Sequence, residues 1–239
     1  MPTQYNKNDI LEMCEDAMKN PALFYTQKLV NYQGICPDAR IPYTEIIAEY
    51  LIDHLATYTA GLPTLRRSGF YYTAAHQGKY DPNSPRVEEI TAMKMFNHCR
   101  EGGRYDKIGR ILDYQVPLKN KRSDQVGKID LLAYDSHVLR ILELKKPGVE
   151  AETMLRCVLE GYTYLRTVDT AKLIDDFNRG VPDLHLPEDT PVKASPFVFE
   201  NSRPYRDYFS ECPKLKQLME LLDSLPFFIR EISGGYEVF

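Results

Sequence analysis

The sequence lacks the cysteine patterns that mark structural zinc sites and compact disulfide frameworks. Its five cysteines lie far apart and include no CxxC pair; they are Cys14, Cys36, Cys99, Cys157 and Cys212. This spacing argues against both kinds of site. We therefore expect reduced thiols, as in cytoplasmic proteins.

Segments that would direct the chain to or across a membrane are also missing. The first residues, MPTQYNKNDILEM, contain no basic region followed by an apolar run, so no signal peptide is visible. No stretch approaches the roughly 18 consecutive apolar residues that a membrane span needs. The sequence predicts a cytoplasmic protein with no membrane partner.

Several common catalytic motifs are absent as well. The sequence has no GxxxxGKS/T phosphate loop, no HExxH and no GxSxG. Its histidines show no metal-ligand spacing; they are His54, His76, His98, His137 and His185. The net charge of −4 lacks the basic excess typical of nucleic-acid-binding domains, so any phosphate-binding surface must be local.

The composition that remains is that of a globular protein, with 43% hydrophobic and 27% charged residues among 239. The length suggests one domain, or one domain with an appendage. We expect a mainly helical N-terminal extension over residues 1–85, packed on a core over 86–200. Residues 201–239 then supply a helix and a hairpin that complete the same domain.

The core is predicted to contain a helix, three strands, a second helix and a fourth strand. Their predicted ranges are 86–103, 109–119, 128–135, 138–146, 150–167 and 192–200. Three consecutive strands with short links imply an antiparallel meander, and the second helix crosses to a further strand. The fold class is therefore α/β, with a mixed sheet flanked by helices.

Charged side chains interrupt the two central strands of this prediction. Asp130 lies in KIDLLAYD, whereas Glu143 and Lys145 lie in VLRILELKK. A two-residue loop at Ser136-His137 would set Asp130 directly opposite Glu143, with Cβ atoms about 4.5–5.5 Å apart. A three-residue loop would send the two acids to opposite faces of the sheet.

Two ionised carboxylates at this separation repel each other by roughly 3 kcal/mol at an effective dielectric constant of about 20. A shared proton, the ammonium group of Lys145 or a divalent cation would relieve the repulsion. Magnesium characteristically binds one or two carboxylates together with waters and substrate phosphate. The alternative is that both acids lie at the ends or edge of the sheet and are simply solvated.

The stretch GKIDLLAYD followed by ILELKK resembles the PD-(D/E)XK nuclease superfamily. That family carries an acid on one strand and Glu-x-Lys or Asp-x-Lys on its neighbour. Asp130 would be the first acid and Glu143-Leu144-Lys145 the Glu-x-Lys, although Ile129 replaces the proline that names the motif. The resemblance covers residues 86–200 and implies a restriction-endonuclease-like core.

The resemblance implies a metal-dependent nuclease that hydrolyses phosphodiester bonds in nucleic acid, with DNA as the favoured substrate. Asp130, Glu143 and the carbonyl of Leu144 would hold Mg²⁺ or Mn²⁺, and Lys145 would orient the attacking water. The family also places a glutamate on the preceding helix. Two glutamates are available there, and the helical phase favours Glu89 over Glu88 as the third ligand. An ion pair of Glu89 with Arg86 or Arg100 is the alternative.

One branch of the family carries Gln-x-x-x-Tyr on the next helix, and Glu160 and Tyr164 occupy the matching positions. Both lie away from the apolar face of that helix. They are expected to line a substrate groove, unless Glu160 simply pairs with Arg156 one turn away.

Two basic segments complete the candidate site. One supplies Lys119, Lys121, Arg122 and Lys128, and the other supplies Arg66, Arg67, Phe70, Tyr71 and Tyr72. Cations beside aromatic rings suit backbone phosphates and stacked bases. Each segment alone is equally consistent with a solubilising loop. The rival function is a catalytically inactive module of the same fold that binds nucleic acid or a protein partner.

Overall fold

The computed structural model describes residues 4–121, 124 and 126–239. The N-terminal elements are α1 (Lys7–Met18), the 3₁₀ helices η1 (Pro21–Thr26) and η2 (Lys28–Asn31), α2 (Tyr43–Asp53) and α3 (Leu55–Ala60). The central elements are α4 (Val87–Arg100), β1 (Arg110–Pro117), β2 (Lys128–Tyr134), β3 (Leu139–Lys145), α5 (Met154–Thr167), α6 (Thr170–Gly180) and β4 (Val192–Phe199). The chain ends with α7 (Arg203–Phe209), α8 (Pro213–Leu221), β5 (Phe227–Ile232) and β6 (Gly235–Val238).

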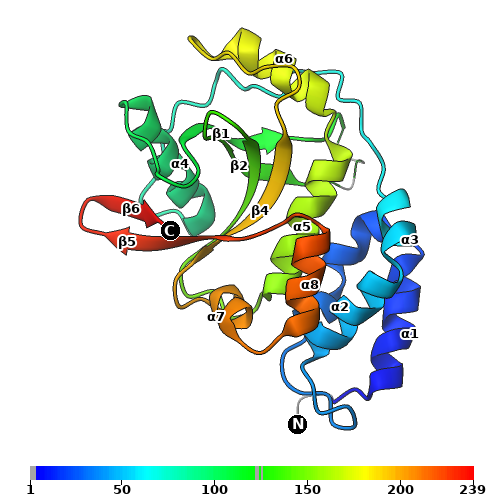
Figure 1. Cartoon of the computed structure of the whole chain (residues 1–239). Coiled ribbons are helices and arrows are strands. Elements are labelled where there is room, and N and C mark those ends of the chain that lie inside the picture. The colour runs from blue at the N-terminus through cyan, green and yellow to red at the C-terminus, as the bar shows by residue number, and fades with distance from the viewer. Residues whose placement is uncertain (1–3, 122–123, 125) are drawn as a thin grey trace.

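The six strands form one mixed sheet in the order β1-β2-β3-β4-β5-β6. Strands β1 to β3 make an antiparallel meander, β4 and β5 run parallel to β3, and β6 returns antiparallel to β5. Helix α4 contacts β1, β2 and β3, whereas α5 lies against β3 and β4 (Figure 1). The prediction of a mixed α/β sheet with a three-stranded meander flanked by helices is confirmed.

The β2–β3 connection has the two-residue loop, which is one of the two alternatives considered from the sequence. The N–H of Asp135 points to the carbonyl of Val138 at 3.4 Å, and Ser136 adopts a left-handed φ of 81°. One carboxylate oxygen of Asp135 also accepts the N–H groups of His137 and Val138, at 2.9 and 2.8 Å. An aspartate that binds its own turn in this way stabilises it. The resulting ladder reaches Leu131 opposite Leu142, so Asp130 and Glu143 are the next pair in that register.

The N-terminal elements share a hydrophobic core with the sheet. Phe24 of η1 and Ile46 of α2 are fully buried in the same cluster as Leu155 and Val158 of α5. Helix α2 also contacts α8, which comes from the other end of the chain (Figure 1). As a consequence α5 is covered on both sides, by the sheet and by η1 and η2.

Helix α6 lies between the predicted helix over 150–167 and the predicted strand over 192–200, and it is not among the elements predicted from the sequence. The side chain of Asp169 caps it by accepting the N–H of Lys172 at 3.1 Å, and Leu173, Ile174 and Phe177 bury its apolar face. The many Asp residues of this stretch obscured that face. None of the helices in the described part of the chain has the length and apolar character needed to cross a membrane.

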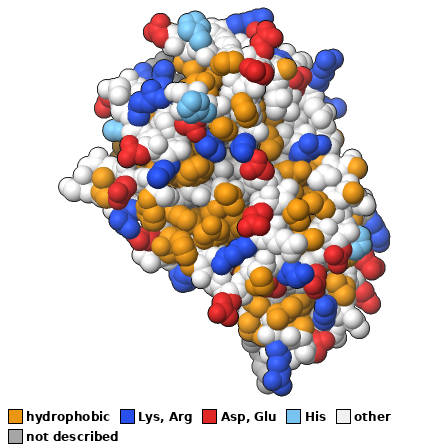
Figure 2. Space-filling model, viewed as in Figure 1, with side chains coloured by type: hydrophobic (Ala, Val, Ile, Leu, Met, Phe, Trp, Pro, Cys, Tyr) orange, Lys and Arg blue, Asp and Glu red, His pale blue; other side chains and the backbone are white. Residues whose placement is uncertain are grey.

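The face of the molecule in Figure 2 carries scattered acidic and basic side chains, with hydrophobic side chains gathered around β5 and α7. Phe209 belongs to this region and is 59% exposed, with its ring packed 5.3 Å from that of Phe228. On this face, no broad field of one charge sign is visible, in keeping with the modest net charge of −4.

Candidate functional site

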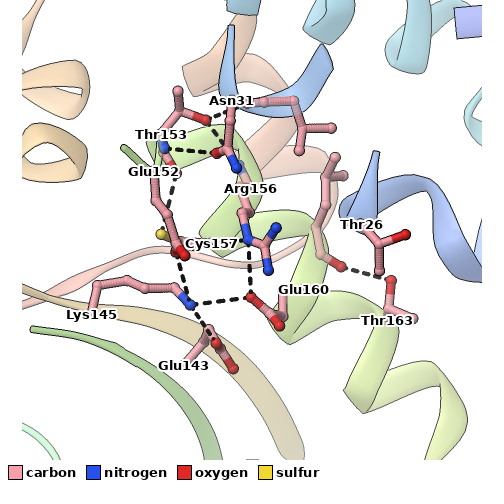
Figure 3. Close-up of polar contacts among 12 residues, drawn as sticks. Thr26, Asn31, Glu143, Lys145, Glu152, Thr153, Arg156, Cys157, Glu160 and Thr163 are labelled. Atoms are coloured by element: carbon pink, nitrogen blue, oxygen red, sulfur yellow. Dashed lines mark hydrogen bonds and ion pairs between the residues drawn. The ribbon is translucent and has the colours of Figure 1, made fainter. Parts of the chain in front are cut away.

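A buried lysine lies among three glutamates where β3 meets α5. Glu143 and Lys145 are two residues apart on β3, so both point to the sheet face that α5 covers. The Lys145 ammonium donates to Glu143 Oε1 at 2.7 Å and to Glu160 Oε2 at 3.1 Å. It also lies 3.1 Å from Glu152 Oε2 (Figure 3). Charged groups are almost never buried unless paired, and these are paired several times over.

Helix α5 supplies further charged and polar side chains that contact these residues. Its cap is Thr153, whose hydroxyl accepts the N–H of Arg156 at 3.2 Å. The Arg156 Nε lies 3.5 Å from Glu160 and 3.7 Å from Glu152, and the Tyr164 hydroxyl donates to Glu160 Oε1 at 3.0 Å. Three carboxylates therefore surround two cations. We call Glu143, Lys145, Glu152, Arg156 and Glu160 the buried charge cluster.

The buried charge cluster shifts the ionisation of its members. Burial raises the pKa of Glu143, and the charges of Asp130 and Glu160 raise it further. Burial alone would lower the pKa of Lys145, but Glu143 and Glu160 outweigh that effect and raise the pKa well above its usual range. For Glu160, the cations Lys145 and Arg156 outweigh burial and lower the pKa. Lys145 is thus an ammonium at neutral pH, and the protonated form of Glu143 is favoured relative to that of an ordinary glutamate.

Asp130 lies beside the cluster, where the β2–β3 ladder ends. Its Oδ2 accepts the backbone N–H of Leu144 at 3.0 Å, and its Oδ1 accepts the amide of Gln115 at 2.8 Å. A side chain thus replaces main-chain pairing at this point. The strand alternation also breaks here, because Ile129 and Leu131 join different hydrophobic clusters and Gln115 on β1 has a left-handed φ of 49°.

The environment of Asp130 disfavours its charged form. Loss of solvation raises its pKa to about 7; Lys145 opposes this shift, and the charges of Glu160 and Glu88 add to it. The carboxyl group therefore changes charge near neutral pH, whereas an ordinary aspartate is ionised from about pH 4 upward. A positive ion beside Asp130 would favour the ionised form.

A cavity of about 240 Å³ opens next to Asp130 at the start of α4. Its lining residues are Pro85, Arg86, Val87, Glu88, Glu89, Gln115, Asp130 and Lys146. Asp130 is half-buried, whereas Glu143 and Lys145 are only 3% and 4% exposed. Of Asp130, Glu143 and Lys145, only Asp130 lines the cavity.

The two glutamates of α4 have different partners. Glu88 accepts the backbone N–H of Lys146 at 3.1 Å, just past the end of β3. Glu89 lies 3.2 Å from the guanidinium of Arg86, which is the ion pair considered as the alternative to a ligand role. Both line the cavity, but Glu88 is the one whose charge acts on Asp130. The geometry thus favours Glu88 over the predicted Glu89 as the third acid of the site.

Glu160 and Tyr164 do not line an open groove, which corrects that expectation. They are 7% and 4% exposed, and Arg166 is the only exposed residue of α5. The reason is the cover from η1, where the Tyr25 ring lies 5.9 Å from the Tyr164 ring. The periodicity of α5 alone could not reveal a second packing partner. The expected pairing of Glu160 with Arg156 is present. Glu152 was not anticipated; it lies just before α5, which begins at Met154 and not at residue 150 as predicted.

The basic residues of the first segment lie near the C-terminal end of β1 and the N-terminal end of β2. Lys119 and Lys121 follow β1, and Lys128 begins β2, opposite Pro117. Arg122 lies outside the described residues. Gly127 connects this loop to the cluster, since a Cβ atom there would come within 2.1 Å of the Tyr164 hydroxyl.

The donor set suits a hard cation bound by few protein ligands. Within residues 4–121, 124 and 126–239, no group of three or more His, Cys, Asp or Glu side chains is arranged as a metal site. However, Glu143 Oε2 is buried without a hydrogen-bond partner. An unsatisfied buried acceptor of this kind costs about 1–3 kcal/mol. Together with Asp130 it offers the one or two carboxylates with which Mg²⁺ is bound when waters and phosphate complete its shell.

Comparison of the chain with protein-family models, with curated proteins and with solved structures finds no match.

Proposed function

We propose that this protein is a metal-dependent nuclease of the PD-(D/E)XK type, with a restriction-endonuclease-like core, that hydrolyses phosphodiester bonds in nucleic acid and favours DNA. The observation that carries the proposal is the meeting of Asp130 and Glu143 where the β2–β3 ladder ends, with Lys145 bound beside them. The element order supports it, because α4 precedes the meander and α5 follows it.

Asp130 and Glu143 would hold Mg²⁺ or Mn²⁺, together with the carbonyl oxygen of Leu144. Such an ion lowers the pKa of a bound water and stabilises charge on a phosphate that is being cleaved. The unpartnered Glu143 Oε2 and the raised pKa values of both acids support this assignment, since a cation would relieve both.

Lys145 acts as a fixed positive charge and hydrogen-bond donor in this proposal. Its contacts with Glu160 and Glu152 keep it in place even if Glu143 turns toward another cation. Because its pKa is raised, it does not serve as the base that removes a proton from water. It orients the water instead and offsets negative charge near it.

Substrate approach is assigned to the cavity beside Asp130. Arg86 and Lys146 line this cavity and offer positive charge to a phosphate, while Gln115 fixes one oxygen of Asp130. The acids that line the cavity are Asp130, Glu88 and Glu89. A phosphodiester bound there needs a divalent cation to offset its repulsion from those acids.

Cleavage assays test this proposal directly. Labelled single- and double-stranded DNA and RNA are incubated with the protein in Mg²⁺, in Mn²⁺ and in EDTA. We expect cleavage with a divalent cation, none in EDTA, and none with Asp130→Asn. Glu237→Gln is the matched control, because this acid is 51% exposed on β6. Absence of cleavage by the unchanged protein under all conditions would refute the proposal.

A second candidate function follows from the burial of the cluster. Glu143 and Lys145 are nearly inaccessible and already bound to each other, as in an ion-pair core that needs no metal. The chain would then be an inactive module of the same fold that binds nucleic acid or a protein. Calorimetry separates the two functions, because only the nuclease requires Mg²⁺ or Mn²⁺ to bind at Asp130.

A further inference from the structure

Two segments that are far apart in the sequence are hydrogen-bonded to each other just beyond the C-terminal end of β1. The amide oxygen of Asn120 accepts the N–H and the hydroxyl of Ser68, at 2.7 and 3.0 Å. The amide nitrogen of Asn120 donates to the carbonyl of Arg66 at 3.0 Å. The guanidinium of Arg67 donates to the carbonyl of Lys119. The two basic segments of the sequence are thus a single structural unit.

Residues of helix α6 contact this unit and hold its backbone in place. The carboxylate of Asp176 accepts the N–H of Tyr71 at 2.8 Å and the ammonium of Lys172 at 2.7 Å. The same ammonium lies 5.1 Å from the ring of Phe70. The Phe70 ring is nevertheless 56% exposed, so a braced backbone presents an aromatic face to solvent. An exposed ring on a fixed base is preorganised for stacking.

Positive charge exceeds negative charge in the segments that form this unit. The described cations are Arg66, Arg67, Lys119, Lys121, Lys128 and Lys172, and the carboxylates in contact with them or their segments are Asp124, Asp169 and Asp176. Six cations against three acids leave an excess of three positive charges, in a chain whose net charge is −4. The asymmetry marks the unit as a local site for an anionic partner.

The unit is continuous with the candidate site. Lys128 begins β2, two residues before Asp130, and a strand rises roughly 3.3 Å per residue. Lys128 pairs with Pro117, and Lys119 lies two residues further along the same chain. An extended polyanion bound to these lysines can therefore also reach Asp130, because the distance to be spanned is no more than about the length of one strand.

We propose that the basic-aromatic surface formed by Arg66, Phe70, Lys119, Lys121 and Lys128 binds a single strand of nucleic acid, with a base stacked on Phe70 and phosphates on the lysines. A single strand fits because its bases expose their faces, whereas a duplex hides them in its own stack. This assignment rests on the proposed nuclease function in naming the strand as the substrate that reaches Asp130, but binding to the surface needs no cleavage.

Stacking is tested by binding in EDTA, where no hydrolysis occurs. Fluorescence anisotropy is measured with a labelled single-stranded DNA, a single-stranded RNA and a DNA duplex. We expect single strands to bind more tightly than the duplex, and Phe70→Ala to weaken single-strand binding about tenfold. Phe209→Ala is the control, since this ring is 59% exposed on α7, and should change nothing. Equal affinity of the Phe70→Ala and unchanged proteins, or a preference for the duplex, would overturn the proposal.

Phosphate contact is tested by the salt dependence of the same binding. Each lysine that neutralises a phosphate contributes about 0.7 to the slope of log K against log salt for a single strand. Lys121→Ala and Lys128→Ala should each reduce the slope by about that amount, whereas Lys107→Ala, at an exposed position outside this surface, should not. Unchanged slopes in both variants would overturn the phosphate assignment.

These measurements separate the two proposals. Single-strand binding that depends on Phe70, in a protein that cleaves nothing, would support the proposed binding surface and contradict the proposed nuclease function. Cleavage that requires Asp130, together with binding that does not change when Phe70 or the lysines are replaced, would support the nuclease function and contradict the proposed binding surface. Thermal melting of each variant confirms that a loss of binding is not a loss of fold.

Discussion

The ammonium of Lys145 lies 2.7 Å from a carboxylate oxygen of Glu143, and both side chains are almost fully buried. Lys145 is further bound by Glu160 and lies 3.1 Å from Glu152. Breaking a buried ion pair from one side leaves its partner charged and unpaired, and this is far more costly than losing a surface pair. Lys145 therefore stabilises the fold in addition to any part in catalysis.

We predict that Lys145→Met lowers the free energy of unfolding in EDTA by about 3–5 kcal/mol, because the buried Glu143 and Glu160 and the half-buried Glu152 lose their common partner. Urea titration followed by circular dichroism measures the change. Lys193→Met is the control, since Lys193 is 38% exposed and pairs with an exposed Asp223, and should cost no more than about 1 kcal/mol. Similar values for the two variants would contradict the buried role of Lys145.

Cleavage by the same variant tests the chemistry of Lys145. A positioned orienting group contributes about 10²–10⁴-fold to a rate, and we expect Lys145→Met to lose cleavage by that factor at a temperature where it remains folded. Its affinity for Mg²⁺ should be retained or raised, because a neighbouring positive charge is gone. Undiminished cleavage by the folded variant would rule out the catalytic role and leave the structural one.

The two glutamates of α4 should differ in importance. Glu88 contacts the end of β3 through the N–H of Lys146, and Glu89 is paired with Arg86. We therefore predict that Glu88→Gln lowers divalent-ion affinity and cleavage more than Glu89→Gln does. Calorimetry with Mn²⁺ and initial cleavage rates give the ranking. A stronger effect of Glu89→Gln would restore the assignment drawn from helix phase alone.

Local sequence signals predicted the meander but left its register open between two loop lengths. Short polar links imply antiparallel neighbours, and a two-residue loop between Asp135 and Val138 fixes which residues lie opposite one another. The local signals could not predict the break in alternation at Asp130, which lies beside Gln115, a residue of the neighbouring strand with a left-handed φ. They also could not place Glu88 and Glu89, because helix phase does not give the position of a helix along the sheet.

The burial of Glu160 shows the same limit at longer range. Its helix has one strongly apolar face, which predicts packing on one side only. The second side is covered by Tyr25 of η1, more than a hundred residues earlier in the chain. Glu160 and Tyr164, two polar positions of an amphipathic helix, are thus interior positions, and the charge of Glu160 is matched by Lys145 and Arg156. Only the tertiary structure reveals that match.

The raised pKa of Asp130 gives a prediction for stability against pH. A carboxyl group with a pKa of about 7 when folded, against 3.8 ordinarily, binds more protons in the folded than in the unfolded state between these values. Its contribution to stability is therefore present at low pH and is lost as the pH rises from about 4 to 7. We expect the slope of this decline in EDTA to be smaller in Asp130→Asn. Urea unfolding at several pH values measures it, and identical slopes would contradict the shift.

Glu160→Gln tests whether the cluster tunes Asp130 by charge. The Glu160 carboxylate raises the pKa values of both Asp130 and Glu143, and its replacement by a neutral amide of the same shape removes that effect. Divalent ions bind the ionised acids, so the affinity of the unchanged protein for Mg²⁺ should rise with pH through about 7, the pKa of Asp130. In Glu160→Gln the same rise should occur at lower pH. Calorimetric titrations between pH 5 and 9 locate the midpoint, with Glu237→Gln as a control in which the exposed carboxylate of β6 is removed instead. An unmoved or higher midpoint in Glu160→Gln would show that Glu160 does not act on Asp130 through its charge.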